Sequence, residues 1–288
     1  MILVTGAAGK TGRAVIRALA QRGQQVTAFV HRPNQSDAVT QAGASVVAVG
    51  SMTNDDALRN ALTNVRAVYH IAPNVSPDEV LFGRKMIDLA LAQGIQHFVY
   101  HSVLHPQTEE MPHHWQKLRV EELLLKSGLA FTILQPAIYM QNVLARWSEI
   151  TAEGVYRVPY AADTRLGMVD LEDVAAAAAI VLTSDDHHGA TYELAGSEIL
   201  SQYEVADVLG ECLSRPIRVE VIPRSVWEAD ARHSGMGEYQ VPILLKMFEY
   251  YEKYGLGGNP RVVSWLLGRP PIRFGEFVRK HLTEHKQR

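Results

Sequence analysis

The sequence predicts a doubly wound α/β protein: a parallel sheet with helices on both faces, followed by a smaller, mostly helical lobe. Short apolar runs alternate with longer helical patterns in the first half, a glycine-rich turn (Thr5–Gly12) follows the first apolar run, and the alternation stops near residue 140. Alternation of this kind favours parallel strands joined by right-handed crossovers, with ligands at the carboxyl ends of the strands.

Six strand–helix repeats are expected in the first half. The predicted strands are Ile2–Val4, Gln25–Val30, Ser45–Val49, Ala67–Ile71, His97–His101 and Phe131–Leu134. Four of the helices between them should end at a glycine, namely Gly23, Gly43, Gly94 and Gly128. Asn54, followed by two acids, predicts a capped helix start, and Pro112 suits the first turn of another helix.

Two parts of the chain are expected to have different tasks. Residues 1–140 are predicted to bind a dinucleotide, and residues 141–288 to form a substrate-covering lobe, with some segments returning to the sheet. The stretch Trp227–Tyr254 carries aromatic and methionine residues at helical intervals. It is either core packing or an apolar lid over a flat or aromatic substrate.

Composition excludes several classes of protein. Hydrophobic residues make up 47% and charged residues 20% of the 288, which is the balance of an ordinary globular protein. The only cysteine, Cys212, rules out an intrachain disulfide and a cysteine zinc site. No apolar run approaches the roughly 18 residues of a membrane span, and the start lacks the layout of a signal peptide. We therefore expect a cytoplasmic protein, either monomer or homodimer, that does not bind a membrane. The net charge of −3 argues against direct binding of nucleic acid.

The glycine turn is the strongest functional signal. Gly6 permits a tight turn, Gly9 lets a diphosphate approach the backbone, and Gly12 lets the helix pack closely on the sheet. The following helix start offers N–H groups and a partial positive charge to phosphates. The residues predicted to bind the cofactor here are Gly6, Ala8, Gly9, Lys10, Thr11 and Gly12.

The end of the second predicted strand indicates which dinucleotide is bound. A carboxylate at this position would bind the ribose 2′-hydroxyl of NAD, but Val30–Pro33 contains none. Arg32 instead offers a charged fork to a 2′-phosphate. The sequence thus predicts NADP(H), with NAD(H) left open as a second cofactor.

Taken together, the chain resembles the NmrA-like group of atypical short-chain dehydrogenases/reductases over essentially its whole length. The motifs that carry the resemblance are Thr5–Gly12, Val30–Pro33, Phe98–Ser102, His113–Lys117, Val120–Leu123, Thr132–Pro136, Asn142, Tyr254–Asn259, Trp265–Pro270, Phe274 and Phe277. The resemblance implies an NADP(H)-binding Rossmann lobe with a cleft for substrate. It also implies that Lys117 contacts the nicotinamide ribose, and that Ile71, Ala72 and Pro136 border the cofactor.

One position departs from the wider superfamily, which uses a tyrosine four residues before the lysine as proton donor. Here that position is His113, which the i, i+4 spacing places on the same helix face as Lys117. Because His113 lies near a helix start, the helix dipole disfavours its imidazolium form, and a neutral imidazole is a weaker acid. Ser102, at the end of the fifth strand, either orients a substrate carbonyl or the cofactor, or caps a local turn.

Two functions from different classes remain open at this point. The first is an NADP(H)-dependent oxidoreductase that reduces a small apolar acceptor, such as a quinone or a conjugated carbonyl, with Lys117, His113 and Ser102 as catalytic candidates. The second is a non-catalytic NADP(H)-binding redox sensor with a regulatory protein partner, and an isomerase that uses bound cofactor is a weaker third.

The several histidines between residues 97 and 114 lack neighbouring carboxylates at ligand spacing, so no metal site is expected.

Overall fold

The computed structural model describes residues 1–286, which form two compact units. The first unit comprises residues 1–109, 113–136 and 174–193, and the second comprises residues 110–112, 137–173 and 194–288. The segment 174–193 falls within the predicted 141–288 lobe, yet it belongs to the first unit. The final two residues of that predicted lobe lie outside the described residues.

A seven-stranded sheet forms the centre of the first unit, in the order β10-β6-β5-β4-β1-β2-β3. The strands are β1 (Ile2–Val4), β2 (Val26–Val30), β3 (Val46–Val49), β4 (Ala67–His70), β5 (His97–His101), β6 (Phe131–Pro136) and β10 (Ala190–Leu194). Strands β1 to β6 pair in parallel throughout, as in β1 with β2 and with β4. The predicted fold class is confirmed, and the seventh strand is added by the returning segment.

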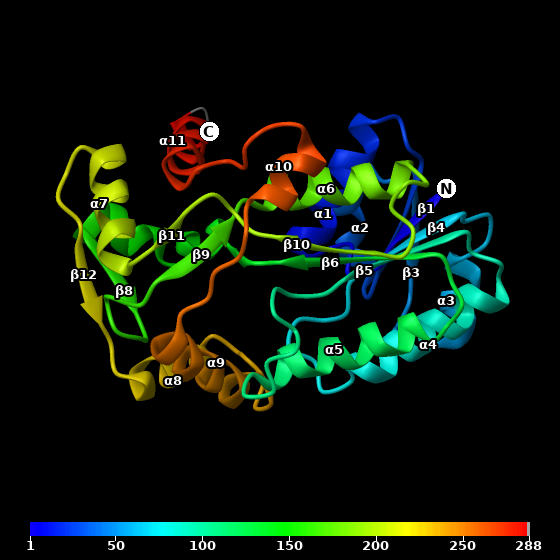
Figure 1. Cartoon of the computed structure of the whole chain (residues 1–288), viewed down its shortest axis with the longest axis horizontal. Coiled ribbons are helices and arrows are strands. Elements are labelled where there is room, and N and C mark those ends of the chain that lie inside the picture. Colours follow the sequence, from blue (N-terminus) through cyan, green and yellow to red (C-terminus); the bar gives the residue numbers. More distant parts are fainter. Residues whose placement is uncertain (287–288) are drawn as a thin grey trace. The chain divides into compact units, whose positions relative to one another are not determined.

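Helices cover both faces of this sheet. They are α1 (Lys10–Gln21), α2 (Ser36–Gln41), α3 (Asp55–Ala61), α4 (Glu79–Ala92), α5 (Pro112–Leu125) and α6 (Leu171–Thr183), with a short 3₁₀ turn, η1, at Pro33–Gln35. Figure 1 shows α1, α2 and α6 on one face and α3, α4 and α5 on the other. Beneath α3 to α5, a core that includes Met86, Phe98 and Leu124 is almost fully buried.

Local sequence signals explain where the helices begin and end. Asn54 caps α3, because its side chain accepts a hydrogen bond of 3.1 Å from the Ala57 N–H. The four predicted helix-ending glycines all have positive φ, between 65° at Gly94 and 106° at Gly43. Pro77 precedes helix α4, which begins at Glu79.

The second unit contains more strands than the sequence predicts. Its two small sheets have the orders β11-β9-β7 and β12-β8. Their strands are β7 (Ile138–Tyr139), β8 (Val155–Val158), β9 (Leu166–Val169), β11 (Ile199–Leu200) and β12 (Arg218–Val221). Strands of two to four residues are too short to show a clear periodicity, which is why the lobe was predicted to be mostly helical.

The helices of the second unit pack around a separate core. They are η2 (Met140–Arg146), η3 (Glu149–Glu153), α7 (Gln202–Leu213), α8 (Arg224–His233), α9 (Gln240–Tyr254), α10 (Arg261–Leu267) and α11 (Phe274–Lys286). Ile150, Leu209 and Phe274 are at most 1% exposed in this core.

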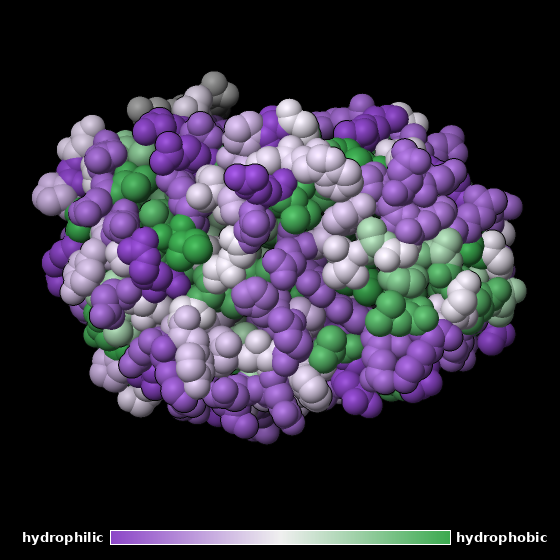
Figure 2. All heavy atoms as spheres, in the orientation of Figure 1, coloured by the Kyte–Doolittle hydropathy of each residue, from purple (hydrophilic) through white to green (hydrophobic). Residues whose placement is uncertain are grey.

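Within residues 1–286, no helix combines the length and apolar character that crossing a membrane requires. On the face drawn in Figure 2, hydrophilic residues predominate and hydrophobic ones form small patches.

Gly83 allows α4 and α5 to approach closely, which makes it a sensitive point of the first unit. A Cβ at Gly83 would lie 2.5 Å from Cγ1 of Val120, which is fully buried. Overpacking costs about 1–3 kcal/mol, against a gain of about 1 kcal/mol in helix propensity. We expect Gly83→Ala to lower the free energy of unfolding by up to about 2 kcal/mol in urea denaturation. In a Val120→Ala background the same change should be neutral or stabilising, and an equal loss there would contradict the steric explanation.

Candidate nucleotide-binding site of the first unit

The carboxyl ends of β1 and β4 meet where the strand order reverses, which is the usual ligand site of a doubly wound sheet. Thr5, directly after β1, holds the two ends together. Its hydroxyl donates to the Ile71 carbonyl at 3.0 Å and accepts from the Ile71 N–H at 2.9 Å. The glycine turn and the segment after β4 therefore lie against each other. That Ile71 borders the cofactor stays a prediction.

The glycine turn leaves space that side chains would fill. Gly6 has φ +58°, and a Cβ there would lie 3.0 Å from Ile71. A Cβ at Gly12 would lie 2.4 Å from the Gly6 carbonyl oxygen, so helix α1 can pack this closely only with glycine. Gly9 is exposed and has only the Gly6 carbonyl oxygen, at 3.2 Å, near its missing Cβ. A ligand can therefore approach the backbone at Gly9.

The charge distribution around this turn suits an anion. The first turn of α1 carries no acid. The first backbone hydrogen bond of the helix runs from the Arg13 N–H to the Gly9 carbonyl, at 3.1 Å. Backbone N–H groups of residues 10–12 precede that bond and offer the partial positive charge of the helix start. Lys10 is exposed, and Ala8 and Thr11 are half-buried. These residues fit the diphosphate of a dinucleotide.

Arg32 follows β2 and is exposed at the same edge of the sheet. Gln35 shapes this turn, because its Oε1 accepts from the backbone N–H groups of His31 and Arg32 at 3.0 Å each. Across the described residues, no acidic side chain pairs with the guanidinium of Arg32. The charge is therefore available to a bound phosphate.

Lys117 is held by the interior of the unit. From α5, its Nζ donates to Glu79 Oε1 at 3.0 Å and to the His101 carbonyl at 3.2 Å. The ammonium also lies 5.3 Å from the centre of the Tyr100 ring. Its side chain is 15% exposed, so one side remains open. Contact with a nicotinamide ribose stays a prediction, and nothing in the sequence singled out Glu79 or Tyr100.

His113 is on the same helix, one turn before Lys117. Its Nδ1 is buried and has no hydrogen-bond partner among the residues that the structure describes. Burial is the main cause that lowers the pKa of His113 to about 2, and His114 and Lys117 contribute by repulsion. The imidazole is therefore neutral, and its position near the start of a helix acts in the same direction as burial.

Ser102 belongs to a buried polar network between β5, α5 and β6. Its hydroxyl donates to Glu121 Oε1, and the Gln135 side-chain amide donates to both oxygens of Glu121 at 3.0 Å. Burial raises the pKa of the Glu121 carboxyl. These contacts favour a structural role for Ser102, and its contact with a ligand stays a prediction. Ala72 and Pro136 are buried at the ends of their strands.

Four further histidines are buried in this unit and neutral. Burial lowers the pKa of His70 and His101 to about 3, and that of His97 and His114 to about 4. His70 Nδ1 lies 3.0 Å from the Thr5 hydroxyl. Residues 1–286 contain no group of three or more His, Cys, Asp or Glu side chains arranged to hold a metal ion.

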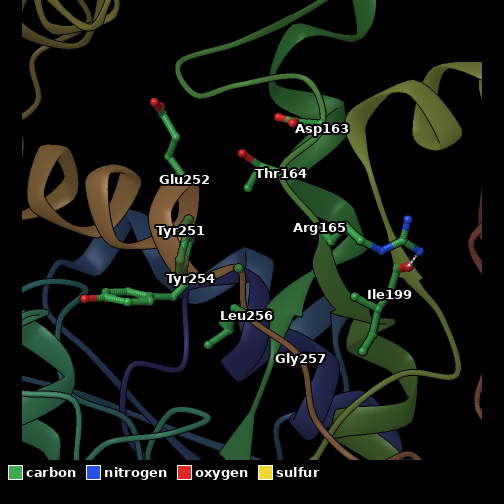
Figure 3. A pocket seen from close by; sticks show the side chains of 10 residues that line it. Asp163, Thr164, Arg165, Ile199, Tyr251, Glu252, Tyr254, Leu256 and Gly257 are labelled. Atoms are coloured by element: carbon green, nitrogen blue, oxygen red, sulfur yellow. Dashed lines mark hydrogen bonds between the residues drawn. The ribbon is translucent and has the colours of Figure 1, made fainter.

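A cavity of about 420 Å³ lies in the second unit, near the end of α9. Tyr251 and Tyr254 line it together with Thr164, whose buried hydroxyl has no partner within the described part of the chain. Figure 3 shows Arg165 turned toward Ile199, whose carbonyl accepts its hydrogen bond at 2.6 Å. Tyr251 is 5% exposed, which favours core packing for that part of the predicted Trp227–Tyr254 lid.

The buried histidines should make the protein sensitive to acid. In the unfolded chain they bind protons below about pH 6.5, whereas the folded chain binds them only near pH 4 and below. The free energy of unfolding should therefore fall as pH drops below about 6.5, by about 1.4 kcal/mol per pH unit for each histidine. Urea denaturation at several pH values measures this slope. His97→Gln should reduce it, and substitution of the exposed His31 by Gln should not; equal slopes for both would disprove the assignment.

Comparison with known proteins shows reductases of similar length. The chain is 28% identical over 283 residues to the NAD(P)H azoreductase of Xenophilus azovorans, with 98% of each chain covered. It is 31% identical over 289 residues to the (4-alkanoyl-5-oxo-2,5-dihydrofuran-3-yl)methyl phosphate reductase of Streptomyces griseus, again with 98% of each covered.

The fold is also found among solved structures. The NADPH-dependent quinone oxidoreductase QOR2 of Escherichia coli, solved as a complex with NADPH, superposes with a TM-score of 0.84 at 27% identity. That match covers 98% of this chain and 100% of the other. The sequence profile of the NmrA-like family matches residues 1–271. This chain therefore belongs to the NmrA-like family.

Proposed function

We propose that this protein is an NADPH-dependent reductase of small conjugated acceptors such as quinones. The observation that carries the proposal is the glycine turn at the β1–β4 edge, which leaves the backbone accessible at Gly9. Two exposed cations, Lys10 and Arg32, lie near this turn, and neither pairs with an acid among the residues that the structure describes. Support comes from relatives named as reductases of azo compounds, a furanone phosphate and quinones, all three of which match over nearly their full length at 27–31% identity.

Each candidate residue has a distinct task in this proposal. Gly6, Ala8, Gly9, Lys10, Thr11 and Gly12 hold the diphosphate, and Arg32 binds the 2′-phosphate. Lys117 binds the nicotinamide ribose, while Ile71, Ala72 and Pro136 border the ring. When bound, NADPH supplies a hydride. The protein positions the acceptor and excludes water from the transfer.

Proton supply is the step for which this chain is least equipped. Because the pKa of its protonated form is low, His113 is a neutral imidazole. The N–H of a neutral imidazole can donate a hydrogen bond, but it is too weak an acid to release a proton readily to an acceptor. Acceptors whose reduced anions are stabilised by conjugation need no strong acid from the protein. That requirement favours small apolar or aromatic quinone-like acceptors over simple ketones, and the low cysteine content favours a cytoplasmic location for the reaction.

Replacement of Arg32 by alanine tests the choice of cofactor. A hydrogen bond to a charged group contributes about 1.5–3 kcal/mol, so Arg32→Ala should weaken NADPH about 10- to 150-fold. NADH has no 2′-phosphate, so its affinity should change little. Fluorescence titration with both coenzymes measures the effect, and Arg22→Ala, at an exposed arginine of the C-cap of α1, is the control. Equal losses for the two coenzymes would rule out the assignment.

A turnover assay distinguishes an enzyme from a sensor. NADPH absorbance is followed with a panel of quinones and enones, and we expect oxidation of NADPH with at least one of them. Lys117→Ala should abolish this turnover. Tight binding of NADPH without turnover on any acceptor would overturn the reductase proposal. It would favour the alternative, an NADP(H)-binding sensor that acts through a protein partner.

A further inference from the structure

We propose that Glu79 is a positioning residue of this site: with Tyr100 it holds the Lys117 ammonium so that one N–H of that ammonium faces the cofactor ribose. This inference rests on the proposed function, because it assumes that Lys117 binds the ribose. It adds a residue that lies 38 positions away from Lys117 in the sequence.

Glu79 is an acid that the fold removes from water. Its side chain is 4% exposed at the first residue of α4. An unpaired carboxylate at such a depth is strongly unfavourable, so it needs both a counter-charge and hydrogen bonds. One oxygen, Oε1, accepts from the Tyr100 hydroxyl at 2.7 Å and from Lys117 Nζ at 3.0 Å. Oε1 of this buried side chain therefore takes part in both an ion pair and a second hydrogen bond.

Tyr100 contributes twice to the geometry. Its hydroxyl orients the Glu79 carboxylate, and its ring lies beneath the Lys117 ammonium, 5.3 Å from Nζ to the ring centre. Burial, and the negative charge of Glu79 next to it, raise the pKa of Tyr100 well above its ordinary value. Tyr100 therefore stays a donor to Glu79 at any pH at which the protein works, and it is no candidate for the proton donor.

The donors on Lys117 leave one hydrogen for a ligand. An ammonium has three N–H groups. Two of them are directed to Glu79 Oε1 and to the His101 carbonyl, which fixes the position and rotation of the group. The third has no partner among the described residues, and the side chain keeps 15% of its surface exposed. A hydroxyl acceptor on a ligand is what the third N–H needs.

Glu79 is also the counter-charge that makes this position of Lys117 possible. Besides Glu79 and Tyr100, the ammonium interacts electrostatically with the carboxyl of Glu121 and with four histidines. Burial keeps all four imidazoles neutral. These histidines are His70, His101, His113 and His114. Glu121 is already occupied by Ser102 and Gln135. Glu79 is therefore the acid that binds the ammonium directly.

Glu79→Gln removes the charge and keeps the shape. Its amide oxygen can still accept from Tyr100, so the fold should survive, and thermal unfolding checks this. We expect the dissociation constant and KM for NADPH to rise about tenfold, with kcat within about twofold, because only a binding contact is loosened. Tyr100→Phe, which keeps the ring and removes one hydrogen bond to Glu79, should give a smaller rise of about threefold. Glu122→Gln, at the exposed Glu122–Lys126 pair of the same helix as Lys117, is the matched control and should change nothing.

A double-mutant cycle with Lys117→Met shows whether Glu79 acts through Lys117. Methionine keeps the apolar stem of the lysine and removes the ammonium. If the proposal is right, Glu79→Gln adds less than about twofold to the NADPH dissociation constant in the Lys117→Met background, because the group it positions is gone. Fluorescence titration of NADPH gives this result without any acceptor or turnover.

The outcomes separate the two proposals. If Lys117→Met weakens NADPH but Glu79→Gln alone stays within twofold of the unchanged protein, the role of Glu79 is disproved and the reductase proposal stands. Losses that multiply in the double variant also disprove it, because Glu79 would then act independently. If Lys117→Met binds NADPH as the unchanged protein does, the ribose contact of Lys117 fails, and the role of Glu79 fails with it.

Discussion

Strand β1 is hydrogen-bonded to β2 on one side and to β4 on the other, and both pairings are parallel. This pairing brings the glycine turn after β1, Arg32 after β2 and Ile71 after β4 to one edge of the sheet. The Thr5 hydroxyl strengthens the junction by donating to one backbone atom of Ile71 and accepting from another. Every candidate residue of the site is positioned directly by this edge or by a helix that packs against its strands.

Charge is distributed unevenly along that edge, and the distribution matches the parts of a dinucleotide. Lys10 and Arg32 are exposed cations near β1 and β2, where water already screens them and a phosphate can replace that water. On β4 and β5, His70 and His101 are buried, and both stay neutral because burial disfavours their charged forms. A charged phosphate suits the first region and an uncharged ring suits the second. The buried Lys117–Glu79 pair does not disturb this division, because its two charges cancel.

Sequence patterns predicted those parts of the fold that depend on neighbours in the chain. The strands Ile2–Val4 and His97–His101 begin and end as expected, since a continuous apolar run marks a buried parallel strand. The same holds for the glycine turn, where Gly6 and Gly12 have steric reasons, while the approach of a diphosphate at Gly9 stays a prediction. The small strands of the second unit were missed, because two to four residues give no periodic signal. The placement of β10 beside β6 could not be derived either, since it depends on a return of the chain over some 50 residues.

The chemistry of the site shows the same limit more sharply. His113 and Lys117 were found because four residues make one helical turn, a relation that the sequence displays. Glu79 could not be found in this way, because an acid at the start of a helix is ordinarily solvated and stabilises the helix through the helix dipole. Only the fold shows that this acid is buried and that Tyr100 and Lys117 both donate to one of its oxygens. A buried ion pair contributes little net stability by comparison with apolar packing, so stability alone is a weak reason for this chain to have one. Its stronger consequence is geometric: an ammonium with two of its three N–H groups already engaged can direct only the third to a ligand, which limits the positions in which a ligand hydroxyl can be bound.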